Sequence, residues 1–207
     1  MVSNLIEIRP HNIDNRSIQT IVNSLRKGDL AIIPTDSIYA IVGDLNHREV
    51  LEKICKQIGK KPNKANLSIL CDGLSNLSKY TSTISNPLYK LMKRLLPGPF
   101  TFILKANNNI PKIFRQNKKT IGIRVPDNTI CQALISELGN PLISSSIHSV
   151  DEIQEYLTEP QEIYENWKNK INLIVDGGAG KNMGTTVIDA SNGEISIIRE
   201  GLGIEKI

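Results

Sequence analysis

The spacing of apolar residues predicts a chain in which helices and strands alternate. Between Asn15 and Gly28, apolar side chains recur every three or four residues, which predicts an amphipathic helix that ends at the glycine. The apolar run 30–33, which Pro34 ends, predicts a buried strand directly after it. The same reasoning predicts further helices over 46–55, 74–80, 88–95, 128–138 and 160–167, and further strands over 67–71, 100–105, 120–125, 141–146, 173–176, 185–190 and 194–198.

These elements predict a single domain with a mixed sheet. Helices between successive strands are typical of parallel pairing, whereas the turn signal Asn192-Gly193 requires the last two strands to be antiparallel. With 207 residues, of which 40% are hydrophobic, the chain is long enough to bury one substantial core. We therefore expect one α/β (α+β) domain over residues 1–207, with a twisted open mixed sheet flanked by helices. Asn46 is expected to cap the helix over 46–55.

Several protein classes are disfavoured by the composition. No apolar run reaches the length of a membrane span, about 18 residues, so we expect a cytoplasmic protein that does not bind a membrane. Cys55, Cys71 and Cys131 are widely spaced among apolar neighbours and are expected to be buried thiols. The three histidines are too scattered for a metal site, so we expect no structural metal.

Charge is distributed unevenly along the chain. The net charge is +4, yet residues 48–124 hold 16 Lys or Arg against three acids, a local balance of +13. The remainder carries 9 basic and 18 acidic residues, or −9, and residues 125–167 hold eight acids and no Lys or Arg. The basic block favours a polyanion such as nucleotide or RNA, although it is also typical of a solvated surface. Its candidate anion-binding members are Lys56, Lys60, Lys61, Lys64, Lys112, Arg115, Lys118, Lys119 and Arg124.

Two polar segments follow predicted buried strands and are candidate sites. Residues 35–37 bring two hydroxyls and a carboxylate to the end of one strand, and residues 144–148 bring three serines and a histidine to the end of another. Each segment is also typical of an ordinary capped turn or strand edge. A serine hydrolase is disfavoured because no G-x-S-x-G elbow surrounds the serines. Residues 177–181 lack the spacing of a P-loop and are interpreted as a flexible glycine loop over a site.

Two arginines occupy strand positions among apolar residues. Arg124 alternates with Ile121, Ile123 and Val125, and a guanidinium in such a place needs an acidic partner or a ligand. Arg199 follows two isoleucines in a similar position. Both arginines are therefore candidates for an anion-binding site.

Six short motifs follow one another between residues 30 and 201. They are Pro34-Thr-Asp-Ser-Ile-Tyr39, Pro97-Gly-Pro-Phe-Thr101, Ile123-Arg-Val-Pro126, Pro141-Leu-Ile-Ser-Ser-Ser146, Thr185-Thr-Val-Ile-Asp189 and Ile198-Arg-Glu-Gly201. Their order resembles that of the YrdC-domain family of threonylcarbamoyl-AMP synthases. The resemblance implies a positively charged groove in which L-threonine, bicarbonate and ATP form threonylcarbamoyl-adenylate and pyrophosphate. It implies Mg²⁺ only as a companion of ATP, no tightly bound cofactor, and a product used by tRNA-modification partners for the t6A modification.

The resemblance also implies roles for individual residues, although it assigns no catalytic one. On the threonine side it places Thr35, Tyr39, Arg124 and Ser144. On the nucleotide side it places Ser146, Thr186 and Arg199, and the candidates Lys56, Lys60, Lys61 and His148 occupy positions where this chain departs from the family pattern.

These departures resemble the YciO-type branch of the family. The family's K-x-R motif has no arginine here, where the chain offers Lys56-Gln-Ile58 and Gly59-Lys-Lys61, and Ile147-His148 stands at the end of the S-x-N motif. Ala40 also replaces a glycine. Two alternatives to a synthase therefore stay open: a protein that binds double-stranded RNA without synthase activity, and an enzyme that acts on another acyl-adenylate with His148 as base.

Overall fold

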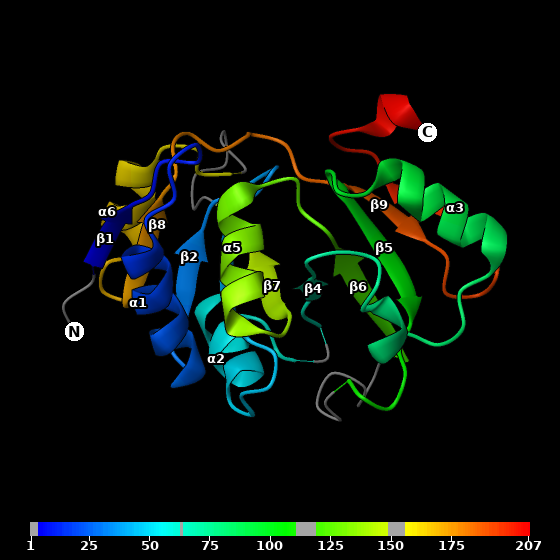
Figure 1. Ribbon diagram of the computed structural model, residues 1–207, viewed down its shortest axis with the longest axis horizontal. Helices are drawn as coiled ribbons and strands as arrows, with labels where there is room; N and C mark the ends of the chain where they lie inside the picture. Colours follow the sequence, from blue (N-terminus) through cyan, green and yellow to red (C-terminus); the bar gives the residue numbers. More distant parts are fainter. Residues whose placement is uncertain (1–3, 63, 111–118, 149–155) are drawn as a thin grey trace.

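The computed structural model describes residues 4–62, 64–110, 119–148 and 156–207 (Figure 1). The helices are α1 (Asn15–Arg26), α2 (Val50–Gln57), α3 (Asn86–Leu95), α5 (Thr129–Leu138) and α6 (Pro160–Trp167), with short 3₁₀ helices η1 (Leu77–Lys79) and η2 (Ile204–Lys206). The strands are β1 (Asn4–Glu7), β2 (Ala31–Ile33), β3 (Ala40–Asp44), β4 (Ser68–Leu70), β5 (Phe100–Lys105), β6 (Thr120–Arg124), β7 (Leu142–Ser146), β8 (Leu173–Asp176), β9 (Thr186–Asp189) and β10 (Ser196–Arg199).

The ten strands form one sheet in the order β1-β8-β2-β3-β7-β4-β6-β5-β9-β10. Pairs β1–β8, β8–β2, β4–β6 and β5–β9 are parallel, and the other neighbours are antiparallel. The hairpin between β9 and β10 turns at Gly193, which has a φ of 90° that glycine adopts without strain. The predicted mixed sheet flanked by helices, in one domain, is confirmed.

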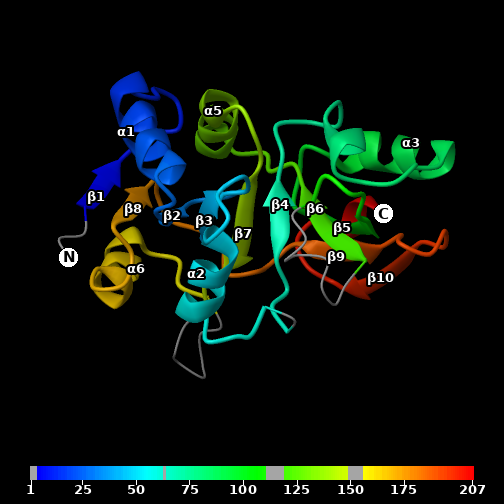
Figure 2. The same ribbon diagram turned by 90° about the horizontal axis from the view of Figure 1, so that it is seen from below.

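Helices cover the two halves of this sheet differently. In Figure 2, α1 and α5 lie on one side of β8, β2, β3 and β7, and α2 and α6 lie on the other. These helices bury the apolar residues of the strands in two separate clusters. Over β5 and β6, the side opposite α3 carries no α-helix in the described part of the chain, and this side is hollowed into a groove.

The sequence of β5 explains which side of that half is covered. Phe100, Phe102 and Leu104 are buried in the cluster that includes Leu88 and Met92 of α3. Successive side chains of a strand point to opposite faces, so Thr101 and Ile103, which alternate with these three residues, face away from α3. Those residues line the groove, so α3 and the groove lie on opposite sides of β5.

Two of the predicted element boundaries are wrong. The helix predicted from 46 begins at Val50, and Asn46 does not cap it, since the Asn46 and His47 N–H groups donate to Asp44 and close a turn before the helix. The helix predicted over 74–80 is a single 3₁₀ turn, η1. Short strands β1 and β3 were missed, because four or five residues carry little periodic signal.

The cysteines agree with the expectation from composition. All three cysteines are free and buried, and burial raises the pKa of Cys71 and of Cys131 to about 12, so neither thiol is a ready nucleophile at neutral pH. In the part of the chain that the structure describes, no helix is long and apolar enough to cross a bilayer. The same part holds no group of three or more His, Cys, Asp or Glu arranged to bind a metal ion.

Candidate functional site

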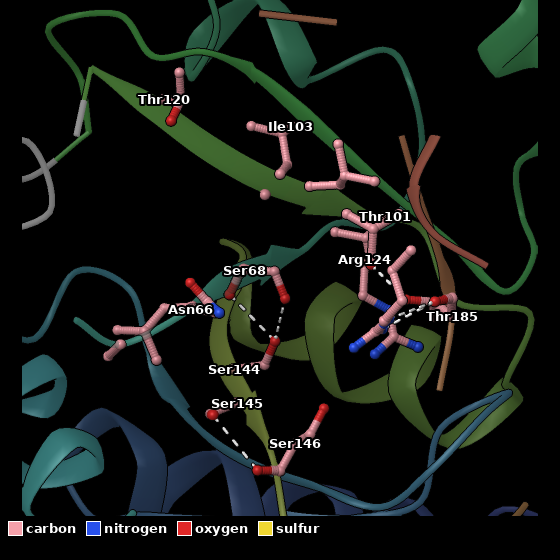
Figure 3. A pocket seen from close by; sticks show the side chains of 16 residues that line it. Asn66, Ser68, Thr101, Ile103, Thr120, Arg124, Ser144, Ser145, Ser146 and Thr185 are labelled. Carbon is pink, nitrogen blue, oxygen red and sulfur yellow. Dashed lines mark hydrogen bonds between the residues drawn. The ribbon is translucent and has the colours of Figure 1, made fainter. Parts of the chain in front are cut away.

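A groove of about 380 Å³ lies on the face of the sheet opposite α3. This volume lies within the range of pockets that hold small ligands, about 300–1,000 Å³. Strands β4, β5, β6, β7, β9 and β10 and the loop before β4 contribute its walls, and Figure 3 shows their side chains converging on the cavity. Segments from distant parts of the sequence, between residues 65 and 199, therefore meet at one site.

The lining of this groove is rich in hydroxyl groups and positive charge. Two guanidinium groups, those of Arg124 and Arg199, line it, and none of the described residues that line it is an Asp or Glu. The hydroxyl-bearing residues of the lining are Ser68, Thr101, Thr120, Ser144, Ser145, Ser146 and Thr185. Donors of this kind, without a carboxylate to repel an anion, form a site suited to phosphate or carboxylate groups.

Arg124 is held at the end of β6 by the turn that follows β2. Its Nη2 atom donates to Asp36 Oδ1 at 2.8 Å and to Ser37 Oγ at 2.9 Å, and lies 3.3 Å from Thr35 Oγ1. The side chains of Arg124 and Asp36 are only 6% and 7% exposed. The acidic partner that the sequence required for Arg124 is therefore Asp36, and the guanidinium also reaches the groove.

Two pairs of hydroxyls bridge neighbouring strands across the floor and the wall of the groove. Ser68 Oγ of β4 lies 3.0 Å from Ser144 Oγ of β7. Thr101 Oγ1 of β5 lies 2.7 Å from Thr185 Oγ1, which also accepts a hydrogen bond from Arg199 Nη2 at 3.2 Å. Arg199 is further fixed because Nε and Nη2 both donate to the Thr185 carbonyl oxygen. These bonds align the groove's donors before any ligand arrives (Figure 3).

Gly122 keeps the floor between these pairs open. A Cβ atom at this position would lie 3.1 Å from Ser68 Cβ, and 3.3 Å from both the Leu67 carbonyl oxygen and Thr101 Cγ2. A glycine inside a strand often marks a place where a ligand approaches the backbone closely. The missing side chain therefore leaves space at the point where the hydroxyl pairs converge.

Several residues predicted for the site lie elsewhere. Thr35 is beside the groove but not in its lining, because its hydroxyl donates to the Ile38 carbonyl oxygen and accepts from the Ser37 N–H. Tyr39 is fully buried, accepting from the Gly177 N–H and donating to the Gly178 carbonyl oxygen, and burial raises its pKa well above the usual value. The structure brings neither hydroxyl into the groove.

Thr186 also points away from the groove. Its hydroxyl accepts from the Gly201 N–H and lies 3.0 Å from the Gly201 and Leu202 carbonyl oxygens, so it fastens the segment after β10 to β9. Its neighbours Thr185 and Val187 line the groove instead. Thr186, which the resemblance implies, is therefore one position away from Thr185, which faces the groove.

The lysine candidates and His148 lie outside the lining. Lys56, Lys60 and Lys61 are exposed, in α2 and in the loop that leads toward the groove-lining residues 65–68. His148 is exposed and its ring lies 5.1 Å from that of Tyr156. Other members of the basic block, Lys112, Arg115 and Lys118, lie outside the described residues, as do 151–155 of the acidic stretch.

Five polar groove residues were not singled out from the sequence: Asn66, Ser68, Thr101, Thr120 and Thr185. Thr101 and Thr185 stand inside matched motifs, and their position in the motif was the available signal. Asn66 and Ser68 belong to no motif, and the pairing of β4 with β6 and β7 brings them to the site.

The glycine segment after β8 is fastened rather than free. The Gly180 N–H donates to the Thr158 carbonyl oxygen at 2.8 Å, and the Lys181 N–H donates to the Ser37 carbonyl oxygen at 2.9 Å. A Cβ atom at Gly180 would lie 2.8 Å from the Tyr39 ring, so this glycine permits close packing. The expected flexible loop is therefore a hydrogen-bonded connection between β8 and β9.

Comparison with other proteins identifies relatives along nearly the whole chain. The model of the Sua5/YciO/YrdC family, described as telomere recombination, matches residues 23–201. YciO of Escherichia coli K12, an uncharacterized protein, is 37% identical over 204 residues, covering 98% of this chain and 97% of YciO. The threonylcarbamoyl-AMP synthase of Bos taurus is 28% identical over 197 residues, covering 91% of this chain and 69% of the synthase.

Solved structures agree with the observed architecture. The crystal structure of E. coli YciO superimposes with a TM-score of 0.89 at 36% identity, covering 99% of this chain and 98% of that one. The crystal structure of P. abyssi Sua5 complexed with L-threonine gives a TM-score of 0.87 at 23% identity, covering 96% of this chain and 58% of that one. Both structures thus share the fold of this chain.

Proposed function

This chain belongs to the Sua5/YciO/YrdC family, and from that premise we propose that it is a threonylcarbamoyl-AMP synthase whose groove binds L-threonine and ATP. The observation that carries the proposal is the lining of the groove, with two guanidinium groups and seven hydroxyl-bearing residues but no Asp or Glu among the described residues. Such a lining favours the anionic groups of both substrates. The similarity of this chain to the threonylcarbamoyl-AMP synthase of Bos taurus supports the proposal of the same activity.

The proposed reaction requires positioning and charge neutralisation more than proton transfer by the protein. The threonine amino nitrogen bonds to the carbon of bicarbonate with loss of water. An oxygen of the resulting carbamate then attacks the α-phosphorus of ATP, and the bond to the leaving pyrophosphate breaks. Fixed donors that contact the transferring group and the leaving group lower the barrier to such a displacement. The product, threonylcarbamoyl-adenylate, would supply the t6A modification of tRNA.

The two arginines differ in the charge that they offer to these substrates. Arg124 is paired with the carboxylate of Asp36, so the pair is neutral as a unit. Among the described residues, Arg199 donates only to uncharged oxygens of Thr185, so it keeps its full positive charge. Arg199 is therefore the better phosphate-binding group, and Arg124 suits the carboxylate of threonine or bicarbonate. The described lining of the groove offers no carboxylate ligand for Mg²⁺, so the ion would arrive bound to the phosphates of ATP as part of the substrate.

The test is an assay of pyrophosphate release with ATP, Mg²⁺, L-threonine and bicarbonate. We expect release that depends on threonine, together with a new adenylate on chromatography. Arg199→Ala should lose the activity, whereas Arg94→Ala, which removes the same charge from the exposed surface of α3, should keep it. The synthase proposal is wrong if the unaltered protein releases no pyrophosphate beside an active relative, and pyrophosphate released without threonine would indicate another reaction on ATP.

Thr185, which directly precedes β9, and Thr186, its first residue, give a matched pair of variants. Thr185→Val removes a hydroxyl from the groove and is expected to weaken ATP binding about 2–13-fold, the value of one hydrogen bond. Thr186→Val removes the hydroxyl that accepts from the Gly201 N–H, and is expected to lower the free energy of unfolding by about 1–3 kcal/mol with ATP affinity unchanged. Calorimetric titration and urea unfolding measure the two effects. Equal loss of affinity in both variants would contradict the observed register of β9.

RNA binding is a second candidate, which a different surface supports. Lys79, Lys90, Lys93 and Arg94 are exposed on η1 and α3, and no Asp or Glu occurs between residues 73 and 126. None of the ion pairs found among the described residues involves these four cations. Because α3 and the groove lie on opposite sides of β5, this surface would bind a phosphate backbone independently of ATP and threonine.

Filter binding of an RNA duplex at several salt concentrations tests this candidate. The logarithm of the affinity should fall linearly with the logarithm of salt concentration. Combined alanine replacement of Lys90, Lys93 and Arg94 should reduce the slope by about one for each phosphate group that the protein no longer binds. Binding that these replacements leave unaltered would exclude α3 as the RNA surface.

A further inference from the structure

One nitrogen of Arg124 is saturated by the turn after β2. Nη2 carries two hydrogens, and three side-chain oxygens of Thr35, Asp36 and Ser37 lie within 3.3 Å of it. No hydrogen of Nη2 is left over for a ligand. Any contact that Arg124 makes in the groove must therefore use the other side of the guanidinium.

The carboxylate of Asp36 is itself fixed at both oxygens. Oδ1 accepts from Arg124, and Oδ2 accepts from the Asp127 backbone N–H at 3.1 Å, in the segment that leads from β6 to α5. With 7% of its side chain exposed, Asp36 is shielded from the water that weakens surface ion pairs. Charge-assisted hydrogen bonds of this kind are roughly twice as strong as neutral ones. Asp36 therefore joins the turn, the end of β6 and the entry to α5.

The same arrangement leaves another nitrogen of the guanidinium without a partner. Arg124 Nε is buried and has no hydrogen-bond partner among the described residues. A buried donor without a partner is unfavourable. The hydrogen bonds to Nη2 therefore do not satisfy every donor of the Arg124 side chain. They fix the orientation of a guanidinium that also lines the groove, as expected of a group held ready for a ligand.

We infer that Asp36 is a positioning residue, which with Thr35 and Ser37 orients the Arg124 guanidinium toward the ligand of the groove. None of these three residues belongs to the lining, so they act through Arg124. The inference rests on the proposed function insofar as the ligand is the threonine or ATP of a synthase. The turn also accepts the Lys181 N–H at the Ser37 carbonyl oxygen, and so holds the segment that leads to Thr185 on the far wall.

The orientation is tested without any ligand by NMR of protein labelled with ¹⁵N in arginine, with the Arg124 signals identified from their loss in Arg124→Lys. In the unaltered protein we expect separate Nη signals for Arg124, because Asp36 hinders rotation of the guanidinium. Asp36→Asn should merge or broaden them. Asp44→Asn is the matched control, since Asp44 is also a largely shielded aspartate that accepts two side-chain hydrogen bonds but contacts no arginine among the described residues. If Asp36→Asn fails to fold, Ser37→Ala removes one acceptor and should broaden the same signals. Unchanged Arg124 signals in the folded variant would overturn the inference.

Chemical rescue tests the link to the ligand. Arg124→Ala should lose threonine binding, and added guanidinium, compared with equal NaCl, should restore part of it because Asp36 still holds the ion. In the double variant Asp36→Asn/Arg124→Ala, the affinity for added guanidinium should be at least about tenfold weaker, because the charge-assisted hydrogen bond from guanidinium to the Asp36 carboxylate is lost. Equal rescue in both proteins would overturn the positioning role. If the unaltered protein binds neither substrate, the proposed function fails, while the NMR result still decides the orientation.

Discussion

Arg124→Ala is expected to lower the free energy of unfolding by about 3–5 kcal/mol, because it leaves a buried carboxylate without its cation. Asp36 is 7% exposed and would keep only the Asp127 N–H as a partner. The same variant is expected to abolish binding of threonine, since it removes the guanidinium group of the groove that suits the threonine carboxylate. Urea unfolding followed by circular dichroism measures the first effect, and calorimetric titration measures the second.

A double variant separates these two consequences. Asp36→Ala/Arg124→Ala removes the uncompensated carboxylate together with the arginine, so most of the lost stability should return while binding stays absent. A loss of less than about 1 kcal/mol in Arg124→Ala would show that the ion pair contributes no more than a surface pair does. Binding that survives in the double variant would exclude Arg124 from the site.

Gly122→Val is expected to close the floor of the groove. Even a Cβ atom there would lie 3.1 Å from Ser68 Cβ, and the two methyl groups of valine need more room than that. Overpacking costs about 1–3 kcal/mol, and a cost of this size imposed on a bound ligand corresponds to a loss of affinity of about 5–150-fold. Calorimetric titration of ATP and threonine measures this loss.

Gly73→Val is the matched control for this substitution. A Cβ atom at Gly73 meets nothing within 4 Å, and Gly73 does not line the groove. Its valine variant should therefore bind both substrates as the unaltered protein does. If Gly122→Val also binds them normally and remains folded, the ligand does not use the floor between Ser68 and Thr101.

Much of the fold and part of the site followed from local sequence patterns. The order of most strands and helices was predicted because helical and strand periodicities persist over the longer elements, as in α1 and β5. The need of Arg124 for an acidic partner was also local, because a guanidinium between buried isoleucines cannot stay unpaired. Motif order predicted that Arg124, Arg199, Ser144 and Ser146 share a site, and all four line the groove.

Tertiary structure alone decided which of the neighbouring residues face that groove. Successive side chains of a strand point to opposite faces, so a register shift of one residue would turn Thr186 toward the groove and Thr185 away from it. The pairing of β9 with β5 sets which of the two threonines faces the groove. The contact of Ser68 with Ser144 joins residues 76 positions apart, and that of Arg124 with Asp36 joins residues 88 apart. The sequence by itself determined the elements and the kinds of side chain at their ends, because these depend on neighbours along the chain. The partners of those side chains depend on strand order and register, which form only when the whole sheet assembles.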